Sequence, residues 1–116
     1  MAAPVVHFEI LGKDASKLHT FYGDLFDWKI NADNPMNYGL VEAAGEGSIG
    51  GGIGSAQDGQ PGQVTFYVGV PDINAALSKA ESMGGKTVMP ETEIPDMVTF
   101  ALFADPEGNV VGLIKQ

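Results

Sequence analysis

The sequence repeats itself at an interval of half its length. Val6-His7-Phe8-Glu9-Ile10 and Val64-Thr65-Phe66-Tyr67-Val68 lie 58 positions apart in a chain of 116 residues, and Asp14 and Asp72 keep the same separation. Both segments are rich in β-branched and aromatic residues, and the first alternates as a half-buried strand does. Such a repeat predicts a fold made of two copies of one supersecondary unit.

A helix is expected after each aspartate, because a short carboxylate can accept hydrogen bonds from the free N–H groups of a first helical turn. Apolar residues then recur with the i, i+3, i+4, i+7 spacing of a buried helix face. The two predicted faces consist of Leu18, Phe21, Tyr22, Leu25 and Phe26, and of Ile73, Ala76, Leu77, Ala80 and Met83. Gly84-Gly85 is a typical end for the second helix.

Three further strand-like segments follow each predicted helix. They cover residues 29–31, 37–43 and 48–54 in the first half, and residues 86–89, 98–103 and 109–115 in the second. Asp105-Pro106-Glu107-Gly108-Asn109 predicts a hairpin turn between the last two. The pattern indicates an α+β class. We expect one domain over 1–116, with module 1 at about 1–56, a Gly- and Gln-rich linker at 56–62 and module 2 at about 63–116.

The charge composition limits the partners. The net charge is −9, with six lysines and no arginine, so nucleic acid is an unfavourable partner. There is no cysteine, which leaves no disulfide, thiolate ligand or thiol nucleophile. No basic, apolar leader and no window near the roughly 20 apolar residues of a membrane span are found, and we expect a cytoplasmic protein.

The order of these segments resembles the vicinal oxygen chelate superfamily, which contains glyoxalases, bleomycin resistance proteins and dioxygenases. The similarity extends over nearly the whole chain. It implies two βαβββ modules that form an open, incompletely closed β-barrel or cup with the helices outside, and it implies a homodimer. The segments that carry it are Val6–Ile10, Phe21-Tyr22-x-x-Leu25-Phe26-x-Trp28, Gly51-Gly52-Ile53, Val70-Pro71-Asp72-Ile73 and Ala104–Asn109.

The resemblance also implies four metal-ligand positions on the inner sheet face. His7 matches the first of them. The others fall on Thr65, on Gly112 and on Gly51 or Gly52, where the side chain is a poor ligand or is missing. A catalytic zinc or non-haem iron needs about three protein ligands. We therefore expect no metal and no other cofactor, and regard lactoylglutathione lyase or extradiol dioxygenase activity as the least favoured assignment.

Three functions remain open for such a cavity, and whether the chain is an enzyme is undecided. The first is binding of a small, mostly apolar or aromatic molecule without a catalytic metal. The second is a metal-independent lyase or isomerase that uses His7 and Glu9 for proton transfer, since strand alternation places both on one face. The third is an accessory domain with a vestigial cavity. The predicted cavity lining is Tyr38, Thr65, Tyr67 and Gly112.

Other residues are expected in the core, on the surface or in a loop. His19 is expected on the solvent side of the first helix, and Phe21, Tyr22, Phe26 and Trp28 between helix and sheet. Glu91, Glu93 and Asp96 are expected in a Pro-bounded surface loop, with Met89 and Met97 as candidates for an adaptable lid.

Overall fold

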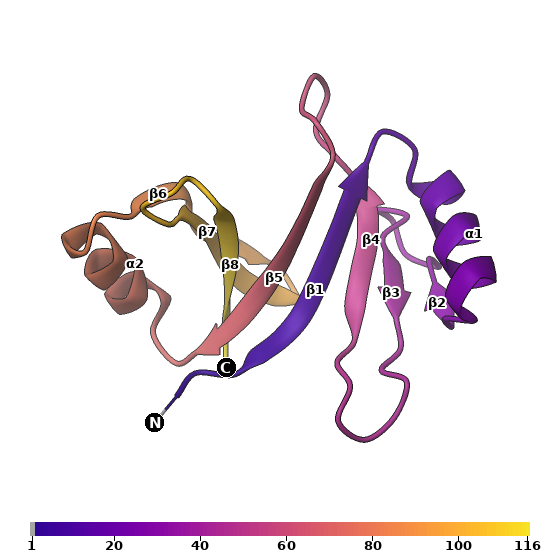
Figure 1. The fold of residues 1–116 in the computed structure, drawn as a ribbon, viewed down its shortest axis with the longest axis horizontal. Coiled ribbons are helices and arrows are strands. Elements are labelled where there is room, and N and C mark those ends of the chain that lie inside the picture. The colour runs from indigo at the N-terminus through magenta and orange to yellow at the C-terminus, as the bar shows by residue number, and fades with distance from the viewer. Residues whose placement is uncertain (1) are drawn as a thin grey trace. The chain divides into compact units, whose positions relative to one another are not determined.

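The computed structural model describes residues 2–116, which form eight strands and two helices in the order βαβββ–βαβββ (Figure 1). The chain divides into two compact units. We call His7–Val64 module 1, and Thr65–Gln116 with residues 2–6 module 2. A strand that crosses one of these boundaries is assigned to the module that holds most of its residues. The predicted α+β class and the repeated βαβββ unit are confirmed.

Module 1 contains an open sheet of four strands in the order β2-β3-β4-β1, with one helix on one face (Figure 1). Strands β1 and β4 run parallel, while β2–β3 and β3–β4 are antiparallel. The parallel neighbours are the first and last strands of the module, so the chain returns to its starting strand. The elements are β1 (Val5–Gly12), α1 (Ala15–Phe26), β2 (Ile30–Asn31), β3 (Gly39–Val41) and β4 (Gly51–Ser55).

Module 2 has the same connectivity, with its four strands in the order β5-β8-β7-β6. Strands β5 and β8 are parallel, and β6–β7 and β7–β8 are antiparallel. The sequence repeat is therefore also a repeat of strand pairing. The elements are β5 (Gln63–Val70), α2 (Ile73–Ser82), β6 (Lys86–Ile94), β7 (Val98–Ala104) and β8 (Val110–Lys115).

The predicted helix signals are present in the structure. The carboxylates of Asp14 and Asp72 accept hydrogen bonds from the backbone N–H groups of Lys17 and Ala75, at 3.2 and 3.0 Å. Just after α2, Gly84 has φ +98°, a conformation that favours glycine. At the predicted hairpin, the Asp105 N–H donates to the Asn109 carbonyl at 2.9 Å, which links β7 to β8.

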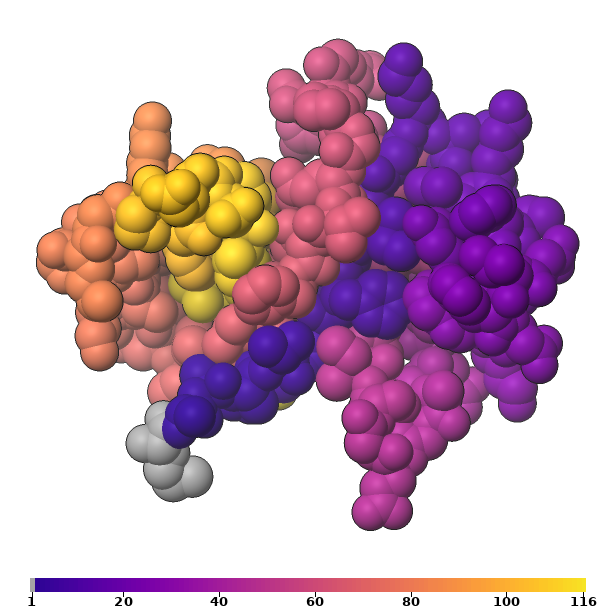
Figure 2. All heavy atoms as spheres, in the orientation of Figure 1, coloured from indigo at the N-terminus to yellow at the C-terminus, as the bar shows by residue number. Residues whose placement is uncertain are grey.

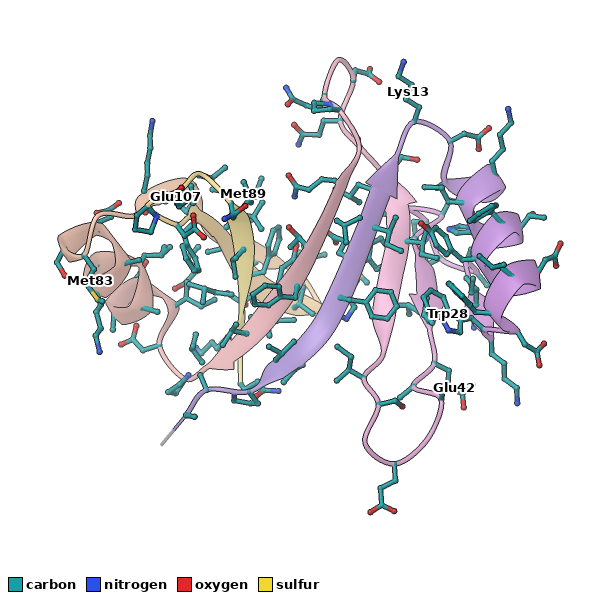
Figure 3. All side chains as sticks on the ribbon, in the orientation of Figure 1. Lys13, Trp28, Glu42, Met83, Met89 and Glu107 are labelled. Atoms are coloured by element: carbon teal, nitrogen blue, oxygen red, sulfur yellow. The ribbon has the colours of Figure 1, made fainter. Side chains whose placement is uncertain are left out.

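Each helix packs on one face of its own sheet and encloses a separate core. Module 1 buries Ile10, Val41 and Ile53, and module 2 buries Ile73, Leu77, Ala101 and Leu113. Trp28 lies between α1 and the sheet, with its ring centroid 5.3 Å from that of Phe8 (Figure 3). The face opposite each helix is left without a covering helix of its own module.

The predicted helix faces are wider than the faces that the helices bury. Leu18 and Tyr22 pack against the module 1 core. Phe21, Leu25 and Phe26 instead retain 57%, 57% and 53% of their surface exposed, and Met83 of α2 retains 68%. The core assignments of these four residues were wrong. A single helix on a small sheet contacts it along a narrow stripe, whereas the spacing pattern accepts a broad arc of the helix.

The predicted loop at Glu91 and Glu93 is wrong, because both residues belong to β6. This strand lies at the end of the module 2 sheet order, and its pairing register shifts between Thr87 and Met89 and again between Met89 and Thr92. Pro90 is tolerated there because outer strands and bulges do not need every N–H in the ladder. Asp96, with φ +62°, does lie in the turn that follows.

Two loops project from module 1: residues 42–50 between β3 and β4, and residues 56–62 after β4 (Figures 1 and 2). The second contains neither helix nor strand. Neither helix within residues 2–116 has the length and apolar character to cross a membrane.

Candidate functional site

The polar residues of β1 lie on the face of module 1 that α1 does not cover. Phe8 and Ile10 point into the core beneath the helix. Because side chains alternate along a strand, His7 and Glu9 lie on the opposite face, as the sequence predicted. Both side chains are half-buried. A carboxylate and an imidazole are therefore held two residues apart on a rigid strand.

Tyr38 joins these two side chains. Its hydroxyl lies 3.1 Å from His7 Nε2 and donates a hydrogen bond of 2.9 Å to Glu9 Oε2. A phenol has one hydrogen, so when it donates to Glu9 it accepts from His7, whose Nε2 then carries the proton. The three groups form a directed chain from imidazole to phenol to carboxylate, which we call the His7–Tyr38–Glu9 chain.

Tyr38 itself is held by Asn34. The Asn34 amide donates to the Tyr38 carbonyl at 2.7 Å and accepts from the Tyr38 N–H at 2.9 Å. Both backbone groups of Tyr38 are thereby satisfied outside any strand. The Asn34 side chain therefore fixes the position from which the Tyr38 phenol reaches β1.

Burial sets the protonation of the histidine. Desolvation lowers the pKa of His7 below its ordinary value of 6.5, and the nearby Glu9 carboxylate opposes this effect as the smaller influence. The imidazole is consequently neutral at pH 7 and can accept a proton or a hydrogen bond.

The ring of Tyr38 occupies space that glycine leaves open. Gly52 is the β4 partner of Glu9 in the parallel ladder. A Cβ at Gly52 would collide with the Tyr38 hydroxyl end, and one at Gly54 would lie 2.8 Å from the Tyr38 ring. The helix-free face of module 1 is thus aromatic because two glycines of one strand make room for the ring.

Module 2 has the same packing of a tyrosine ring over glycine, formed by other residues. Tyr67 of β5 pairs with Gly112 of β8, and a Cβ at Gly112 would collide with the Tyr67 ring. The neighbouring Thr65 hydroxyl donates to the Val110 carbonyl at 2.8 Å. Thr65 and Tyr67 are both buried. In each module, therefore, one tyrosine ring lies over glycine of the last strand.

Residues 5–113 match the family model of the Glyoxalase/Bleomycin resistance protein/Dioxygenase superfamily. This chain belongs to that superfamily. The sequence resemblance is confirmed, and the βαβββ repeat with its open sheets is the structural basis of the match.

Among curated relatives, this chain is 30% identical over 80 residues to CFP32 of Mycobacterium tuberculosis (strain CDC 1551 / Oshkosh), which is provisionally named a glyoxylase. The match covers 69% of this chain and 30% of CFP32, so the chain spans less than a third of its relative's length. The protein of the same name from Mycobacterium bovis matches equally.

Several solved structures share the fold. Methylmalonyl-CoA epimerase from Mycobacterium tuberculosis aligns with a TM-score of 0.69 at 15% identity, over 96% of this chain and 86% of the epimerase. A superfamily member from Vibrio splendidus 12B01 aligns with a TM-score of 0.66 at 15% identity, over 99% and 100%. The hypothetical protein BH1468 from Bacillus halodurans C-125 reaches 0.73 at 12% identity, over 100% and 96%. At such identities the likeness establishes the fold alone.

The side chains at the superfamily's metal positions do not fit a catalytic metal. Module 1 offers His7 and Glu9, while neither Gly51 nor Gly52 has a side-chain donor, and a Cβ at either would collide with an aromatic ring, that of Phe8 or of Tyr38. In module 2 the Thr65 hydroxyl already donates to a carbonyl, and Gly112 is covered in its turn. Residues 2–116 contain no group of three or more His, Cys, Asp or Glu side chains suited to holding an ion.

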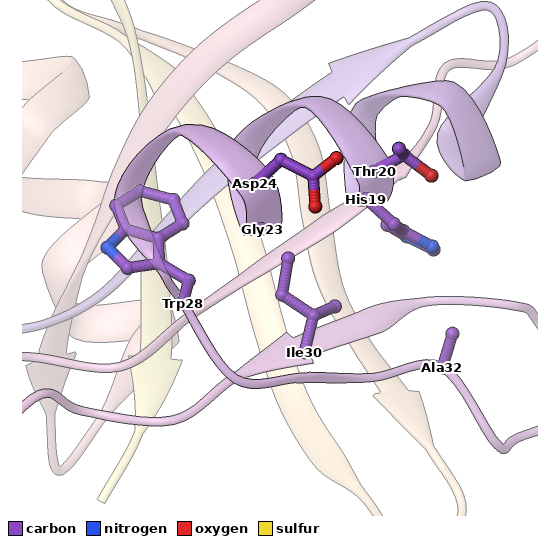
Figure 4. Close-up of a pocket in the computed structure, with 7 residues that line it drawn as sticks. All are labelled: His19, Thr20, Gly23, Asp24, Trp28, Ile30 and Ala32. Carbon is purple, nitrogen blue, oxygen red and sulfur yellow. The ribbon is translucent and has the colours of Figure 1, made fainter.

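Two positions were missed or misplaced by sequence reasoning. Asn34 carries no catalytic signature, and its Asn-Pro context indicates only a turn. His19 was expected on the solvent side, but it is half-buried and its Nε2 donates to the Ile53 carbonyl at 2.8 Å. It borders a shallow hollow of about 320 Å³ between α1 and the segment that follows it (Figure 4).

Proposed function

We propose that this chain is a small-molecule-binding member of its superfamily, which holds a planar, mostly apolar or aromatic ligand without a catalytic metal. The observation that supports the proposal most directly is the covering of Gly52 by Tyr38, with the phenol bound to His7 and Glu9. A position where relatives in the resemblance carry a chelating side chain is here an aromatic surface. In this proposal Thr65, Tyr67 and Gly112 line the corresponding face of module 2.

The chemistry of the site selects the ligand class. An aromatic ring offers a stacking surface to another planar group, worth about 0.5–1.5 kcal/mol beyond the area buried. The neutral imidazole and the carboxylate favour a ligand that also carries a hydrogen-bonding group. With a net charge of −9, the surface attracts cationic ligands in preference to anionic ones.

The proposal is tested by thermal shift and calorimetry with a panel of aromatic aldehydes, ketones and amines. A ligand at 100 times its Kd raises the free energy of unfolding by about 2.7 kcal/mol. We expect Tyr38→Ala to weaken binding roughly tenfold, which corresponds to about 1.4 kcal/mol. Binding and stability should be the same in EDTA and in added Zn²⁺ or Mn²⁺.

Tyr22→Phe is the matched control, because it removes a phenol hydroxyl on the core side of α1, away from the His7–Tyr38–Glu9 chain. Its affinity should equal that of the unmodified protein. A metal ion that binds tightly and is needed for ligand affinity would refute the proposal. So would a panel in which no compound stabilises the protein.

A second function, a metal-independent isomerase or lyase, is favoured by the hydrogen-bonded chain itself. If the other imidazole nitrogen, Nδ1, removes a proton next to a substrate carbonyl, the Nε2 proton can pass to the Tyr38 oxygen and the phenol proton to Glu9. The positive charge then does not remain on a half-buried ring. Reversal of these transfers lets Nδ1 return the proton on the face from which it was removed, to a different atom of the delocalised intermediate, which isomerises the substrate.

Proton exchange separates the two functions. In D₂O with EDTA, an isomerase should replace the α-proton of a bound carbonyl compound by deuterium, which NMR detects. His7→Gln should abolish exchange, and Tyr38→Phe should slow it by about 10²–10⁴-fold while binding persists. Binding without any exchange supports the first function alone.

A further inference from the structure

A hollow on the helix side of the module 1 sheet has no part in the proposed function. Its volume is about 320 Å³, and it lies between α1 and the segment that follows the helix (Figure 4). His19, Thr20 and Asp24 line it from α1. Ile30 and Ala32 line it from the following segment. Because the candidate site lies on the sheet face that α1 does not cover, the hollow is separate from it.

Gly23 keeps this hollow open, although packing does not require a glycine there. A Cβ at this position would lie 3.7 Å from both Ile30 Cδ1 and the Trp28 carbonyl oxygen, which is an ordinary contact distance. Glycine in the interior of a helix is nevertheless less stable than alanine. A residue that breaks such a local rule without a packing reason is typical of a functional site.

The internal repeat bridges the corresponding position with a side chain. At the offset of 58 positions, α2 has Glu81 in place of Gly23 and Ser82 in place of Asp24. The Glu81 carboxylate accepts a hydrogen bond of 2.6 Å from the Thr87 hydroxyl of the next strand. The open space beside α1, and the carboxylate at its edge, are therefore features of module 1 and not of the repeated unit.

The polar groups around the hollow are mostly hydrogen-bond acceptors. The Asp24 carboxylate and the Trp28 carbonyl oxygen can only accept. His19 donates from Nε2 to the Ile53 carbonyl at 2.8 Å, so Nδ1 of the neutral ring is also an acceptor. The Thr20 hydroxyl can accept as well as donate. No lysine is among the described residues that line the hollow, so a matching ligand supplies the donors and the positive charge.

We propose that this hollow binds a small organic cation, a primary alkylammonium ion with a short apolar chain. The ammonium group donates to the Asp24 carboxylate, and the Trp28 carbonyl is a second acceptor beside Gly23. The chain of the ligand packs on Ile30 and Ala32. The net charge of −9 raises the concentration of cations around the protein. Because an exposed ion pair alone is weak, the affinity also depends on the apolar contacts and on the open space.

A titration of the ¹⁵N-labelled chain with butylammonium chloride, followed by NMR, tests this inference. About 150 mM NaCl screens attraction by distant acidic groups, since the Debye length is then about 8 Å. We expect saturable shifts of amide signals within residues 19–32. 1-Butanol and butyrate have a similar apolar chain without the positive charge, and each should bind at least about threefold more weakly.

Substitutions on α1 and just after it identify the groups responsible. Asp24→Asn keeps the shape of the side chain and should raise the Kd for butylammonium about three- to fivefold, as expected for an exposed ion pair. Asp27→Asn is the matched control, because it removes the same charge outside the lining of the hollow, and asparagine tolerates the φ of +58° there. Its Kd should be unchanged. Gly23→Gln places a side chain across the hollow and should abolish the saturable shifts, while a dispersed spectrum shows that the variant is folded.

The outcome is independent of the proposed function, since Tyr38→Ala should leave butylammonium binding unchanged. The absence of saturable shifts in the unmodified protein would overturn the inference. Equal losses of affinity in Asp24→Asn and Asp27→Asn would also overturn it, because the attraction would then be unspecific. Shifts confined to β1 would place the cation at the candidate site instead of the hollow.

Discussion

At the scale of single residues, the helix-free face of module 1 depends on one phenol. Tyr38 reaches His7 and Glu9 of β1 from a position just before β3, and Asn34 holds its backbone there. Removing the Tyr38 hydroxyl would take one hydrogen-bond partner from each of two half-buried polar side chains, at a cost of about 0.5–1.5 kcal/mol for each hydrogen bond. The same contacts would define both binding and proton transfer.

The lowered pKa of His7 makes stability depend on pH. Burial disfavours the imidazolium in the folded state, so below 6.5 the unfolded chain binds more protons at this residue than the folded one. The free energy of unfolding should therefore fall as the pH decreases from 6.5 to the lowered folded pKa, and this contribution should become constant below that value. Urea denaturation at a series of pH values between 5 and 7.5 measures the slope.

His7→Gln provides the comparison for this prediction, because it keeps a polar side chain but does not titrate. The pH dependence of the variant should be shallower than that of the unmodified protein in the same window. Identical slopes for the two proteins would contradict the assigned direction of the pKa.

At the scale of elements, the stability of α1 is limited by Gly23, which lies in the interior of the helix. A Cβ at Gly23 would make ordinary contacts, 3.7 Å from both Ile30 Cδ1 and the Trp28 carbonyl oxygen. Gly23→Ala should raise the free energy of unfolding by about 0.5–1 kcal/mol, because alanine loses less conformational entropy in a helix than glycine does. Thermal or urea denaturation gives the value.

Gly39 in β3 is the contrasting position. A Cβ there would lie 2.6 Å from His19 Nε2 and 2.7 Å from Ile30 Cγ2. Gly39→Ala should lower the free energy of unfolding by about 1–3 kcal/mol, the usual cost of overpacking a close contact. Equal effects of the two substitutions would show that the packing around α1 differs from that described.

At the scale of the whole molecule, the excess of acidic residues destabilises the folded chain. With 15 acidic and 6 basic residues, compaction brings like charges together. Raising NaCl from about 10 to 150 mM shortens the Debye length from roughly 30 to 8 Å. We expect the Tm to rise by about 4 °C, which is equivalent to about 1 kcal/mol for a domain of this size.

The shape of the salt dependence identifies its cause. Charge screening is nearly complete by a few tenths molar salt, so the Tm should level off there. A Tm that falls between 10 and 150 mM NaCl would mean that attractive pairs outweigh the net repulsion. A Tm that only begins to rise in the molar range would indicate ion exclusion from the surface instead.

Local chemistry in the sequence was enough to determine the repeat, the α+β class, the two aspartate caps and the hairpin at Asp105, because each depends on residues close together in the chain. The common face of His7 and Glu9 was also predictable, since alternation along one strand decides it. The glycine and threonine residues at the metal positions that the resemblance implies are visible in the sequence, and the lack of a metal site there stays a prediction.

Only the tertiary structure decided which residues far apart in the sequence contact one another within each module. Tyr38 is 31 positions from His7, and no local rule specifies that its hydroxyl reaches that imidazole. Phe21 and Leu25 satisfy the spacing of a buried helix face but lie outside it, because the small sheet covers only part of the arc. Periodicity reports where apolar residues recur along a helix, whereas the width of the surface packed against it depends on segments far away in the chain.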